Sequence, residues 1–384
     1  MGSLEWVDDE LDTLRRVHLL RGAGPALARQ GAVVELAGQT LVNFASNDYL
    51  GLAGDERLSR AAINAIEASG VGSGSSPLIC GRSEIHEELE RRLAVFEGVE
   101  AALLFPSGFA TNAGIVPALV DRGDAIYADA KNHASLIDGC RLSRAETHVY
   151  PHGNVDALER LLALGHGRRR LILTDTLFSM DGDLARLTAI VEVAARHDAM
   201  LLLDEAHATG IFGAHGRGVA ESLRVDYEGT IRVGTLSKAL GAAGGFVAGS
   251  RPLIQWLANR ARSYVFSTAQ PAAIAAAAIT SLDIITEEPA VRTTLLQTAA
   301  ALRRRLQQQG WNTGPSASQI IPIIIGSPAE AVKLSDTLRQ RGYWVPAIRP
   351  PSVPEGESLL RLSLTAAHTP EMLDGLLEAI GNRP

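Results

Sequence analysis

The chain has 384 residues, of which 46% are hydrophobic and 21% charged, and its formal net charge is -7. These values are ordinary for a globular enzyme with a large core, and no long block of one charge sign points to a nucleic acid or an anionic membrane surface. No apolar run is long enough to span a bilayer, and the N-terminus lacks the apolar core of a signal peptide. The two cysteines, Cys80 and Cys140, do not form a disulfide framework, so we expect a reduced, cytoplasmic protein.

Residues 1–45 predict an N-terminal segment made of a helix and a hairpin. From residue 4 to about residue 30, apolar side chains recur at helical spacing, and a Gly-Ala-Gly-Pro stretch near the end would break the helix. Two strand-like runs then flank Ala-Gly-Gln, which predicts the hairpin. The apolar positions of the predicted helix are Leu4, Val7, Leu11, Leu14 and Leu19.

Residues 46–287 predict a large α/β domain. A turn-rich segment leads into helices, and residues 84–97 form an amphipathic pattern that Ser83 can cap and Gly98 can end. Strand-length apolar runs then recur, with helical segments between several of them. Because these runs are apolar on both faces, we expect a mainly parallel sheet covered on both sides. The runs are AALLF, AIYAD, THVY, RLILTD, AMLLLDEA, TIRVGTL and GFVAGS.

Residues 288–384 predict a smaller α+β domain. A long helical pattern opens it, and three short strand-like runs follow, IIPIII, WVPAI and LLRLSL. A helical pattern separates the first two runs.

Three groups of polar residues follow predicted strands, where open α/β sheets bind ligands. They are Asp204, the stretch from Thr174 to Ser179, and Lys238. Asp204 follows three leucines, so its strand should be buried, although a single such aspartate is more often a helix cap or a satisfied structural residue. His207, three residues later, could suggest a metal, but no third ligand stands at a suitable spacing, so we predict no metal site.

Lys238 lies in the stretch VGTLSKALGAAGG, among small apolar residues and glycines. A lysine at a helix start ordinarily extends its amine into solvent, and that is the default explanation for one residue. The alternative is an amine kept for covalent chemistry, able to form a Schiff base. The neighbouring hydroxyls of Thr235 and Ser237 and the three nearby glycines favour this alternative, because a ligand could approach closely.

The stretch FPSGFATN predicts a strand that ends and a helix that opens at Ser107-Gly108-Phe109. Free N–H groups and the helix dipole make such an end an anion site. No dinucleotide, Walker or nucleophile-elbow pattern occurs. A phosphate site, a buried aspartate and a Schiff-base lysine together are the protein groups that pyridoxal 5'-phosphate (PLP) requires.

At these residues the chain resembles the α-oxoamine synthases, a family of fold-type I PLP enzymes. The resemblance runs from about Leu14 to the C-terminus. It implies an α/β fold-type I transferase with a large, mainly parallel sheet domain and a smaller C-terminal α+β domain. The stretches that carry it are NFASNDYLGL, GSGSSPLICG, LFPSGFATN, DAKNHASLIDG, FSMDGDLA, LLLDEAHATGIFG, GTLSKALG, FSTAQP and RLSLTAAHT.

The resemblance implies four catalytic residues. Lys238 would hold the cofactor as a Schiff base and move the substrate α-proton, and Asp204 would pair with the pyridine nitrogen. His133 would stack on the pyridine ring and border the substrate, although a hydrogen-bonded loop histidine is the ordinary explanation for it. His207, together with Ser179, would hydrogen-bond the phenolic oxygen of the cofactor or its surroundings.

The resemblance also implies a phosphate site shared between two subunits. The backbone N–H groups of Gly108 and Phe109 and the hydroxyl of Thr235 would bind the phosphate. Ser267 and Thr268 would reach the phosphate of the partner subunit's cofactor, so the active unit is expected to be a homodimer.

For the substrates, the resemblance implies that Arg349 binds the amino-acid carboxylate, Arg21 meets the acyl substrate, and Ser352 and Asn47 lie at substrate-contacting positions. The family's usual Pro-Pro-Thr-Val-Pro has serine at Ser352, which keeps the hydroxyl and loses a methyl.

The segment that begins Arg349-Pro350-Pro351 best suits the family member that joins L-alanine to a pimeloyl thioester with loss of CO2, for biotin synthesis. Two alternatives stay open. One is another family member, which would use glycine with acetyl-CoA or succinyl-CoA, or make the serine–palmitoyl conjugate. The other is a non-catalytic partner protein with the same fold, although retention of Lys238, Asp204, His207 and His133 argues against it. The sequence does not decide whether coenzyme A or acyl carrier protein carries the acyl group.

Overall fold

The computed structural model describes residues 2–22, 24, 26–27, 30–36 and 38–383. It divides into two compact units. Unit 1 comprises residues 1–47, 180–182 and 295–384, and unit 2 comprises residues 48–179 and 183–294. Helix α12, Pro289–Gln308, begins in unit 2 and continues into unit 1.

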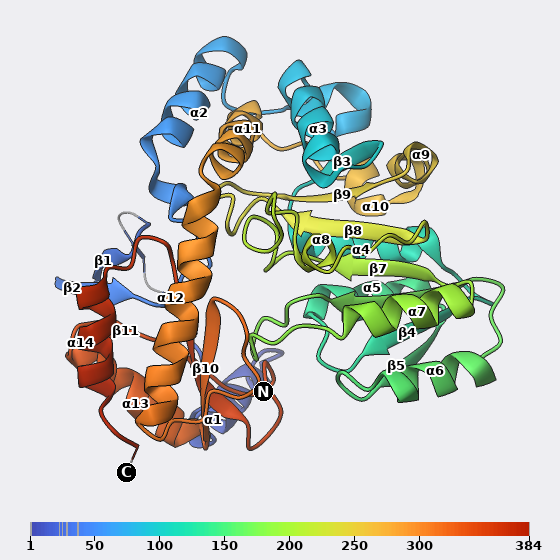
Figure 1. The fold of residues 1–384 in the computed structure, drawn as a ribbon. Helices are drawn as coiled ribbons and strands as arrows, with labels where there is room; N and C mark the ends of the chain where they lie inside the picture. Colours follow the sequence, from blue (N-terminus) through green and yellow to red (C-terminus); the bar gives the residue numbers. More distant parts are fainter. Residues whose placement is uncertain (1, 23, 25, 28–29, 37, 384) are drawn as a thin grey trace. The chain divides into compact units, whose positions relative to one another are not determined.

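Unit 2 is built on a seven-stranded sheet with the order β3-β9-β8-β7-β6-β4-β5 (Figure 1). Strands β4 to β8 run parallel to one another, and β9 runs antiparallel to both β3 and β8. This confirms the predicted mainly parallel sheet. The strands are β3 Ala101–Phe105, β4 Ala125–Asp129, β5 Glu146–Tyr150, β6 Arg170–Asp175, β7 Met200–Asp204, β8 Thr230–Thr235 and β9 Gly245–Gly249.

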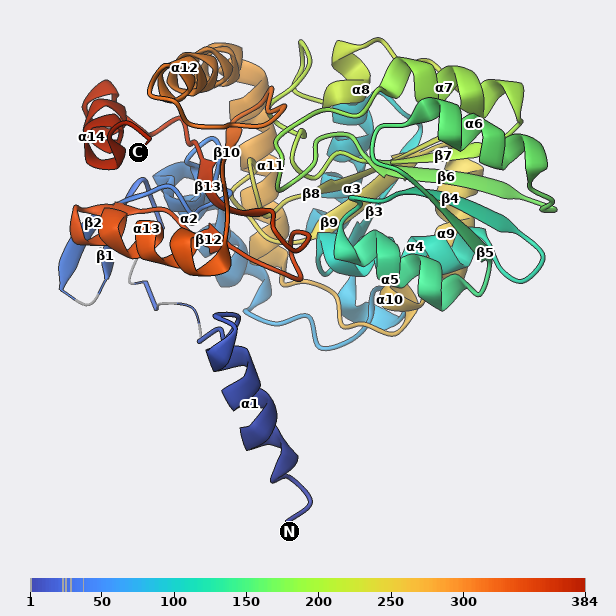
Figure 2. The same cartoon turned by 90° about the horizontal axis from the view of Figure 1, so that it is seen from below.

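Helices cover both faces of this sheet (Figure 2). Adjacent strand residues point to opposite faces, so Leu202 packs with α4, α5, α9 and α10, whereas Leu201 and Leu203 pack with α6, α7 and α8. The helices of unit 2 are α2 Glu56–Ser69, α3 Glu84–Glu97, α4 Gly108–Leu119, α5 Ala134–Ser143, α6 Val155–Leu164, α7 Leu187–Arg196, α8 Val219–Ser222, α9 Arg251–Arg260, α10 Arg262–Val265 and α11 Ala272–Glu287, with short turns η1 Leu52–Gly54 and η2 Pro77–Gly81.

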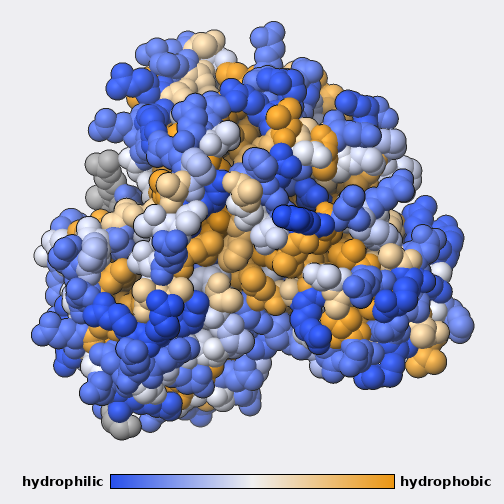
Figure 3. All heavy atoms as spheres, viewed as in Figure 1, coloured by the Kyte–Doolittle hydropathy of each residue, from blue (hydrophilic) through white to orange (hydrophobic). Residues whose placement is uncertain are grey.

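A third apolar cluster joins α2, α3 and α11 to the β3–β9 end of the sheet. Helix α3 follows its predicted pattern, because Leu89, Leu93 and Phe96 are buried and Gly98 ends it in the left-handed conformation. The outward side chains over α2 and α6 are largely hydrophilic (Figure 3), as expected of helices with one buried face.

Unit 1 contains two three-stranded sheets, β1-β2-β11 and β10-β13-β12. The predicted hairpin is confirmed as the antiparallel pair β1–β2, and β11 joins β2 in parallel. The strands are β1 Val33–Leu36, β2 Gln39–Asn43, β10 Ile320–Gly326, β11 Tyr343–Trp344, β12 Ala347–Ile348 and β13 Ser358–Ser363, and the further helices are α1 Trp6–Arg16, α13 Pro328–Gln340 and α14 Pro370–Ile380.

Two predicted elements of unit 1 were wrong in extent. The N-terminal helix ends at Arg16 rather than near residue 30, because His18 adopts a left-handed φ of 58° and the N–H of Leu19 turns back to Leu14. Residues 23, 25 and 28–29 of that prediction lie outside the described residues. The single strand predicted at WVPAI is two strands in different sheets, divided at Pro346, which has no N–H to donate.

Within the part of the chain that the structure describes, none of the helices has the length and apolar character that a membrane crossing requires.

Candidate active site

The carboxyl ends of β6, β7 and β8 bring three polar residues together in unit 2. Asp175, Asp204 and Thr235 are the last residues of these strands, and each is at least 95% buried. The strands are parallel neighbours, and Asp175 stands directly beside Asp204 in the register. The candidate site therefore lies at the sheet edge where the sequence predicts it.

Asp175 and Asp204 form a buried acidic pair. Asp204 accepts hydrogen bonds from the Asn112 side-chain amide at 2.6 Å and from the Ala206 N–H at 2.9 Å. Asp175 accepts from the His133 N–H at 2.7 Å. Burial, followed by the charge of Asp204, raises the pKa of Asp175 well above its ordinary value. A pair of buried carboxylates is best satisfied by a cation beside it.

His133 lies just before α5 and is held in place from both sides. Its backbone N–H binds Asp175, and its Nδ1 lies 2.7 Å from the Ser135 hydroxyl. Burial lowers the pKa of His133, so its ring is neutral at pH 7 and suited to stacking on an aromatic ring. The Phe109 ring approaches it edge-on, with the ring centroids 6.4 Å apart.

Lys238 lies in the loop after β8 and belongs to the same cluster. In addition to the effect of burial, the positive charge of Lys238 lowers the pKa of both His133 and Asp175, so the amine lies near the acidic pair. The residues around it in the chain, Leu236, Ala239 and Leu240, are buried. The packing of these apolar neighbours fixes the backbone of Lys238, and the lysine side chain itself is half-buried.

His207 is buried beside Tyr49, with the tyrosine hydroxyl 2.6 Å from the histidine Nδ1. Ser179 is half-buried in the loop after β6. His207 and Ser179 belong to unit 2, as do Lys238 and Asp204.

The start of α4 forms an anion cradle. Ser107 caps the helix by accepting from the N–H groups of Ala110 and Thr111. Gly108 and Phe109 are the first two residues of α4, so their N–H groups have no acceptor within the helix. Gly108 packs so closely on β8 that an added Cβ would lie 3.4 Å from the Thr235 side chain.

The Thr235 hydroxyl donates to the Gly244 carbonyl at 2.7 Å and lies 2.9 Å from the Ser237 hydroxyl. The hydrogen of Thr235 is therefore already used inside the loop. Ser237 is exposed, and its hydroxyl can donate to an anion while Thr235 accepts or relays.

These residues fit PLP. The buried acidic pair complements a protonated pyridine nitrogen, Lys238 supplies an amine, and the α4 cradle matches a phosphate. The side-chain oxygen of Asn112 is buried without a partner in the described structure, so this oxygen can accept a hydrogen bond from a bound group. The described residues contain no group of three or more His, Cys, Asp or Glu side chains placed to hold a metal ion.

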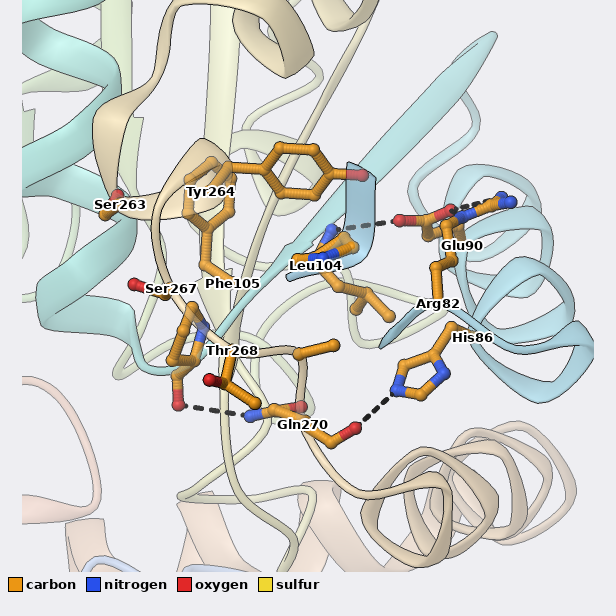
Figure 4. A pocket seen from close by; sticks show the side chains of 13 residues that line it. Arg82, His86, Glu90, Leu104, Phe105, Ser263, Tyr264, Ser267, Thr268 and Gln270 are labelled. Carbon is orange, nitrogen blue, oxygen red and sulfur yellow. Dashed lines mark hydrogen bonds and ion pairs between the residues drawn. The ribbon is translucent and has the colours of Figure 1, made fainter. Parts of the chain in front are cut away.

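Ser267 and Thr268 lie between α10 and α11 and line a small pocket together with Arg82, His86 and Glu90 (Figure 4). This pocket is in unit 2, and Ser263, Tyr264 and Gln270 also line it.

Four of the predicted substrate residues, Arg21, Asn47, Arg349 and Ser352, belong to unit 1, whereas His133 belongs to unit 2. Arg21 donates to the carbonyls of Arg349 and Pro350 at 3.2 and 3.1 Å, and Arg349 donates to the His18 carbonyl. Burial and the charge of Arg21 lower the pKa of Arg349, and its Nε is buried without a partner in the described structure. Two neighbouring guanidinium groups with a spare donor are suited to an anion.

Asn47 and Ser352 occupy different positions in unit 1. The side-chain oxygen of Asn47 accepts from Arg361 at 3.0 Å, and Arg361 also donates to Ser363 at 2.8 Å. Ser352 is exposed, and its N–H bonds to the Arg349 carbonyl in a tight turn.

The sequence-based set of site residues omitted Asn112, Asp175, Tyr49 and Arg361. Asp175 lies in the stretch from Thr174 to Ser179 that the sequence analysis singled out, and it ends a buried strand as Asp204 does, but no role was assigned to it. Asn112 stands one helical turn after Gly108 and was visible in the FPSGFATN stretch. Arg361 is 95% buried on β13 and donates to Asn47 and Ser363.

His152 connects loops on either side of the site. Its Nδ1 lies 2.8 Å from Asp129, and its Nε2 lies 2.9 Å from Asp183. These two hydrogen bonds raise the pKa of His152 to about 9. Asp129 ends β4, three residues before Asn132 of the Asn132-His133 turn, and Asp183 lies in the loop that carries Ser179, so the charged ring holds both loops together.

Comparisons with known proteins agree with this site. A family model described as aminotransferase class I and II matches residues 39–380. An 8-amino-7-oxononanoate synthase from Anaeromyxobacter dehalogenans is 48% identical over 379 residues, covering 99% of this chain and 95% of the relative. A structure of serine palmitoyltransferase from S. paucimobilis with a bound PLP–myriocin aldimine is 30% identical with a TM-score of 0.92, covering 98% of this chain and 96% of that one.

A structure of 8-amino-7-oxononanoate synthase from Francisella tularensis is 28% identical, with a TM-score of 0.77 over 88% of this chain and 96% of that one. Fold similarity thus extends across enzymes with different acyl substrates, whereas the higher sequence identity is to one of them. Similarity along nearly the whole chain, in sequence and in fold, leads to one conclusion: the chain belongs to the aminotransferase class I and II family and, within it, to the PLP-dependent α-oxoamine synthases.

Proposed function

We propose that this enzyme condenses L-alanine with a pimeloyl thioester to give 8-amino-7-oxononanoate, CO2 and the free thiol. The observation that carries the proposal is the 48% identity to an 8-amino-7-oxononanoate synthase over 99% of the chain. The cluster of Lys238, Asp204, Asp175 and His133 supports it, because a relative without catalysis would have no need for a buried acidic pair beside an amine.

PLP, when bound, supplies a ring that accepts electrons and so stabilises negative charge at the amino-acid Cα. Asp204 would keep the proton on the pyridine nitrogen, because its carboxylate is buried and fixed by Asn112 at 2.6 Å. His133, neutral at pH 7, would stack on the ring face. His207, held by Tyr49, and Ser179 would bind the phenolic oxygen or its surroundings.

The N–H groups of Gly108 and Phe109 would bind the phosphate, with the hydroxyl of Thr235 acting beside or through Ser237. Ser267 and Thr268 would reach the phosphate of the partner subunit's cofactor, which makes the active unit a homodimer. The exposed side chain of Phe266, next to Ser267, supports a surface that a partner covers.

Arg349 would bind the carboxylate of L-alanine and hold it so that the correct bond at Cα breaks. Arg21, which contacts the Arg349 backbone, would meet the acyl substrate, with Ser352 and Asn47 at the edge of the substrate site. Lys238 would remove the proton from Cα and return a proton after CO2 is lost. Between these steps Cα attacks the thioester carbonyl, the carbon–sulfur bond breaks, and the thiol takes up a proton.

The enzyme would work in the cytoplasm. Cys80 and Cys140 are both free, and Cys80 is exposed, which suits a reducing compartment.

The test is thiol release from acyl-CoA by PLP-loaded enzyme, measured for each pairing of L-alanine, glycine or L-serine with pimeloyl-, acetyl-, succinyl- or palmitoyl-CoA. We expect L-alanine with pimeloyl-CoA to give the highest kcat/KM by at least about tenfold. A preference for glycine with acetyl-CoA or for L-serine with palmitoyl-CoA would reject the proposal and retain the family. Pimeloyl-acyl carrier protein, assayed in parallel, identifies the acyl carrier.

A further inference from the structure

The segment between α10 and α11 is anchored by its backbone. It carries Ser267 and Thr268 and ends at Gln270. The Gln270 carbonyl accepts from His86 Nε2 at 2.8 Å (Figure 4). It also accepts from the Ser73 hydroxyl at 2.5 Å. Since the His86 Nδ1 accepts from the Ser83 N–H at 3.1 Å, the histidine hydrogen is on Nε2 and points at Gln270.

The side chain of Gln270 makes a second connection. Its amide nitrogen donates to the carbonyls of Pro106 and Ala243, at 3.1 Å each. Its side-chain oxygen is buried without a partner in the described structure, so the amide is held by its donors alone. An added Cβ on Gly244 would lie 2.3 Å from the amide nitrogen, so the loop approaches Gln270 as closely as a glycine allows.

Both carbonyls belong to the subunit's own phosphate cradle. Pro106 precedes Ser107, the cap of α4. Ala243 precedes Gly244, whose carbonyl accepts from Thr235 at 2.7 Å and from the Leu236 N–H at 2.9 Å. A movement of the Gln270 amide would therefore shift the start of α4 and the loop that contains Lys238.

We propose that Gln270 is a positioning residue that couples the two cofactor sites of the homodimer. This inference rests on the proposed function, in which Ser267 and Thr268 reach the partner subunit's cofactor. On one side, Gln270 fixes the cradle of its own subunit. On the other, it fixes the segment that completes the cradle of the partner, so cofactor bound at one site stiffens the other.

The coupling can be tested with mixed dimers in which only one subunit keeps Lys238 and the other carries Lys238→Ala. In the cis dimer, Gln270→Glu is in the subunit that keeps Lys238. In the trans dimer, it is in the other subunit. The readout is the PLP concentration that gives half-maximal borohydride labelling of the Lys238 subunit, identified by mass through different affinity tags.

We expect the half-maximal PLP concentration to rise about fivefold in both the cis and the trans dimer, because each loses an ordinary neutral hydrogen bond that holds a cradle. A rise in the cis dimer alone would overturn the coupling, and no rise in either would overturn any positioning role. Gln270→Met, which keeps the length and removes the donors, must reproduce the result, and the melting temperature of each dimer checks folding.

Two controls separate the possible failures. Gln309→Glu should leave labelling unchanged, because Gln309 also donates to a backbone carbonyl, that of Leu377 at 3.0 Å, and has an unpartnered side-chain oxygen, but contacts no cradle. Ser267→Ala with Thr268→Ala in trans should weaken labelling. If it does and Gln270→Glu in trans does not, only the coupling is wrong. If it does not, the shared phosphate site of the proposed function is wrong, and the coupling with it.

Discussion

Two carboxylates at neighbouring strand ends, Asp175 and Asp204, set the charge of the candidate site. Both are buried, and the pKa of Asp175 is raised well above its usual value. The groups that balance this charge are Lys238 and, in the proposed function, the protonated pyridine nitrogen. The charge of the site is therefore suited to a cationic ring. Lys238 contributes a reactive amine as well as a positive charge.

At the scale of single residues, Lys238→Ala should abolish covalent attachment of PLP and lower kcat by more than about a thousandfold, because no other amine takes its place. Borohydride labelling followed by peptide mass measurement checks the attachment. Lys333→Ala, on the exposed side of α13, is the control and should behave as the native enzyme. Labelling of a different lysine in the native protein would contradict the assignment.

Arg349→Lys should raise the KM for L-alanine about tenfold or more and change the KM for the thioester much less, because an ammonium cannot bind a carboxylate through two parallel hydrogen bonds. Steady-state kinetics with each substrate varied checks this. Arg341→Lys is the control, since Arg341 is exposed and donates to the Ala379 carbonyl. A larger effect on the thioester KM would move Arg349 to the acyl end of the site.

The sequence could identify Lys238, Asp204 and His207 as candidates because each follows a recognisable strand. Tyr49 could not be found in this way, since it contacts His207 across 158 residues of sequence. Arg361 was missed for the same reason, because its contact with Asn47 spans 314 residues. The roles assigned to all these residues stay predictions.

At the scale of elements, the loops around the site depend on His152, which bridges Asp129 and Asp183. His152→Gln should lower the free energy of unfolding by about 1–3 kcal/mol near pH 6, since the buried carboxylate of Asp129 and the half-buried carboxylate of Asp183 lose their cation. The pKa of His152 is raised, to about 9 from an ordinary 6.5. The stabilisation is therefore complete below about pH 6.5 and is lost as the pH rises through about 9.

Thermal melting of the native protein and His152→Gln from pH 6 to pH 10 checks this prediction, and the difference in Tm should close at the alkaline end. His166→Gln, at an exposed site, should show no such difference. A difference that stays constant with pH would mean that the ring supports the loops without its charge.

The contact of β9 with the start of α4 leaves no room for a side chain. Gly245→Ala would place a Cβ 2.4 Å from the Thr111 hydroxyl and 2.7 Å from the Gly108 backbone. We expect a loss of about 1–3 kcal/mol in stability and weaker PLP binding, because the anion cradle must move. Urea unfolding and PLP titration check this against Gly72→Ala, whose Cβ would meet nothing within 4 Å. Equal PLP affinity in the two variants would show that the α4 start is not the phosphate site.

The spacing of apolar residues was sufficient to predict most helices and strands. It failed where the pairing of distant strands or the local backbone conformation decides the structure. Most strands of the large sheet were predictable because they are buried on both faces and carry short apolar runs, although the edge strand β5 is largely exposed. The division of WVPAI into β11 and β12 was not, because it depends on two different partner strands, β2 and β13. The early end of α1 depends on the left-handed backbone of His18, which no spacing of apolar residues reveals.

At the scale of the whole molecule, the N-terminal residues and the C-terminal residues form one unit, since Tyr343 in β11 pairs with Val42 in β2. A division read along the sequence does not reveal such pairing, and the predicted domain boundaries stay a prediction. The family, the fold and the cofactor follow from similarity over nearly the full chain. The choice of acyl substrate is carried by sequence identity to relatives rather than by the shared fold.

The most direct test of the central claim is to supply L-alanine labelled at its carboxyl carbon together with pimeloyl-CoA, and to follow CO2, free thiol and product by mass spectrometry. The account predicts labelled CO2 and free thiol in equal amounts, with 8-amino-7-oxononanoate free of label. Thiol release without labelled CO2, or a product that retains the label, would contradict a decarboxylative condensation.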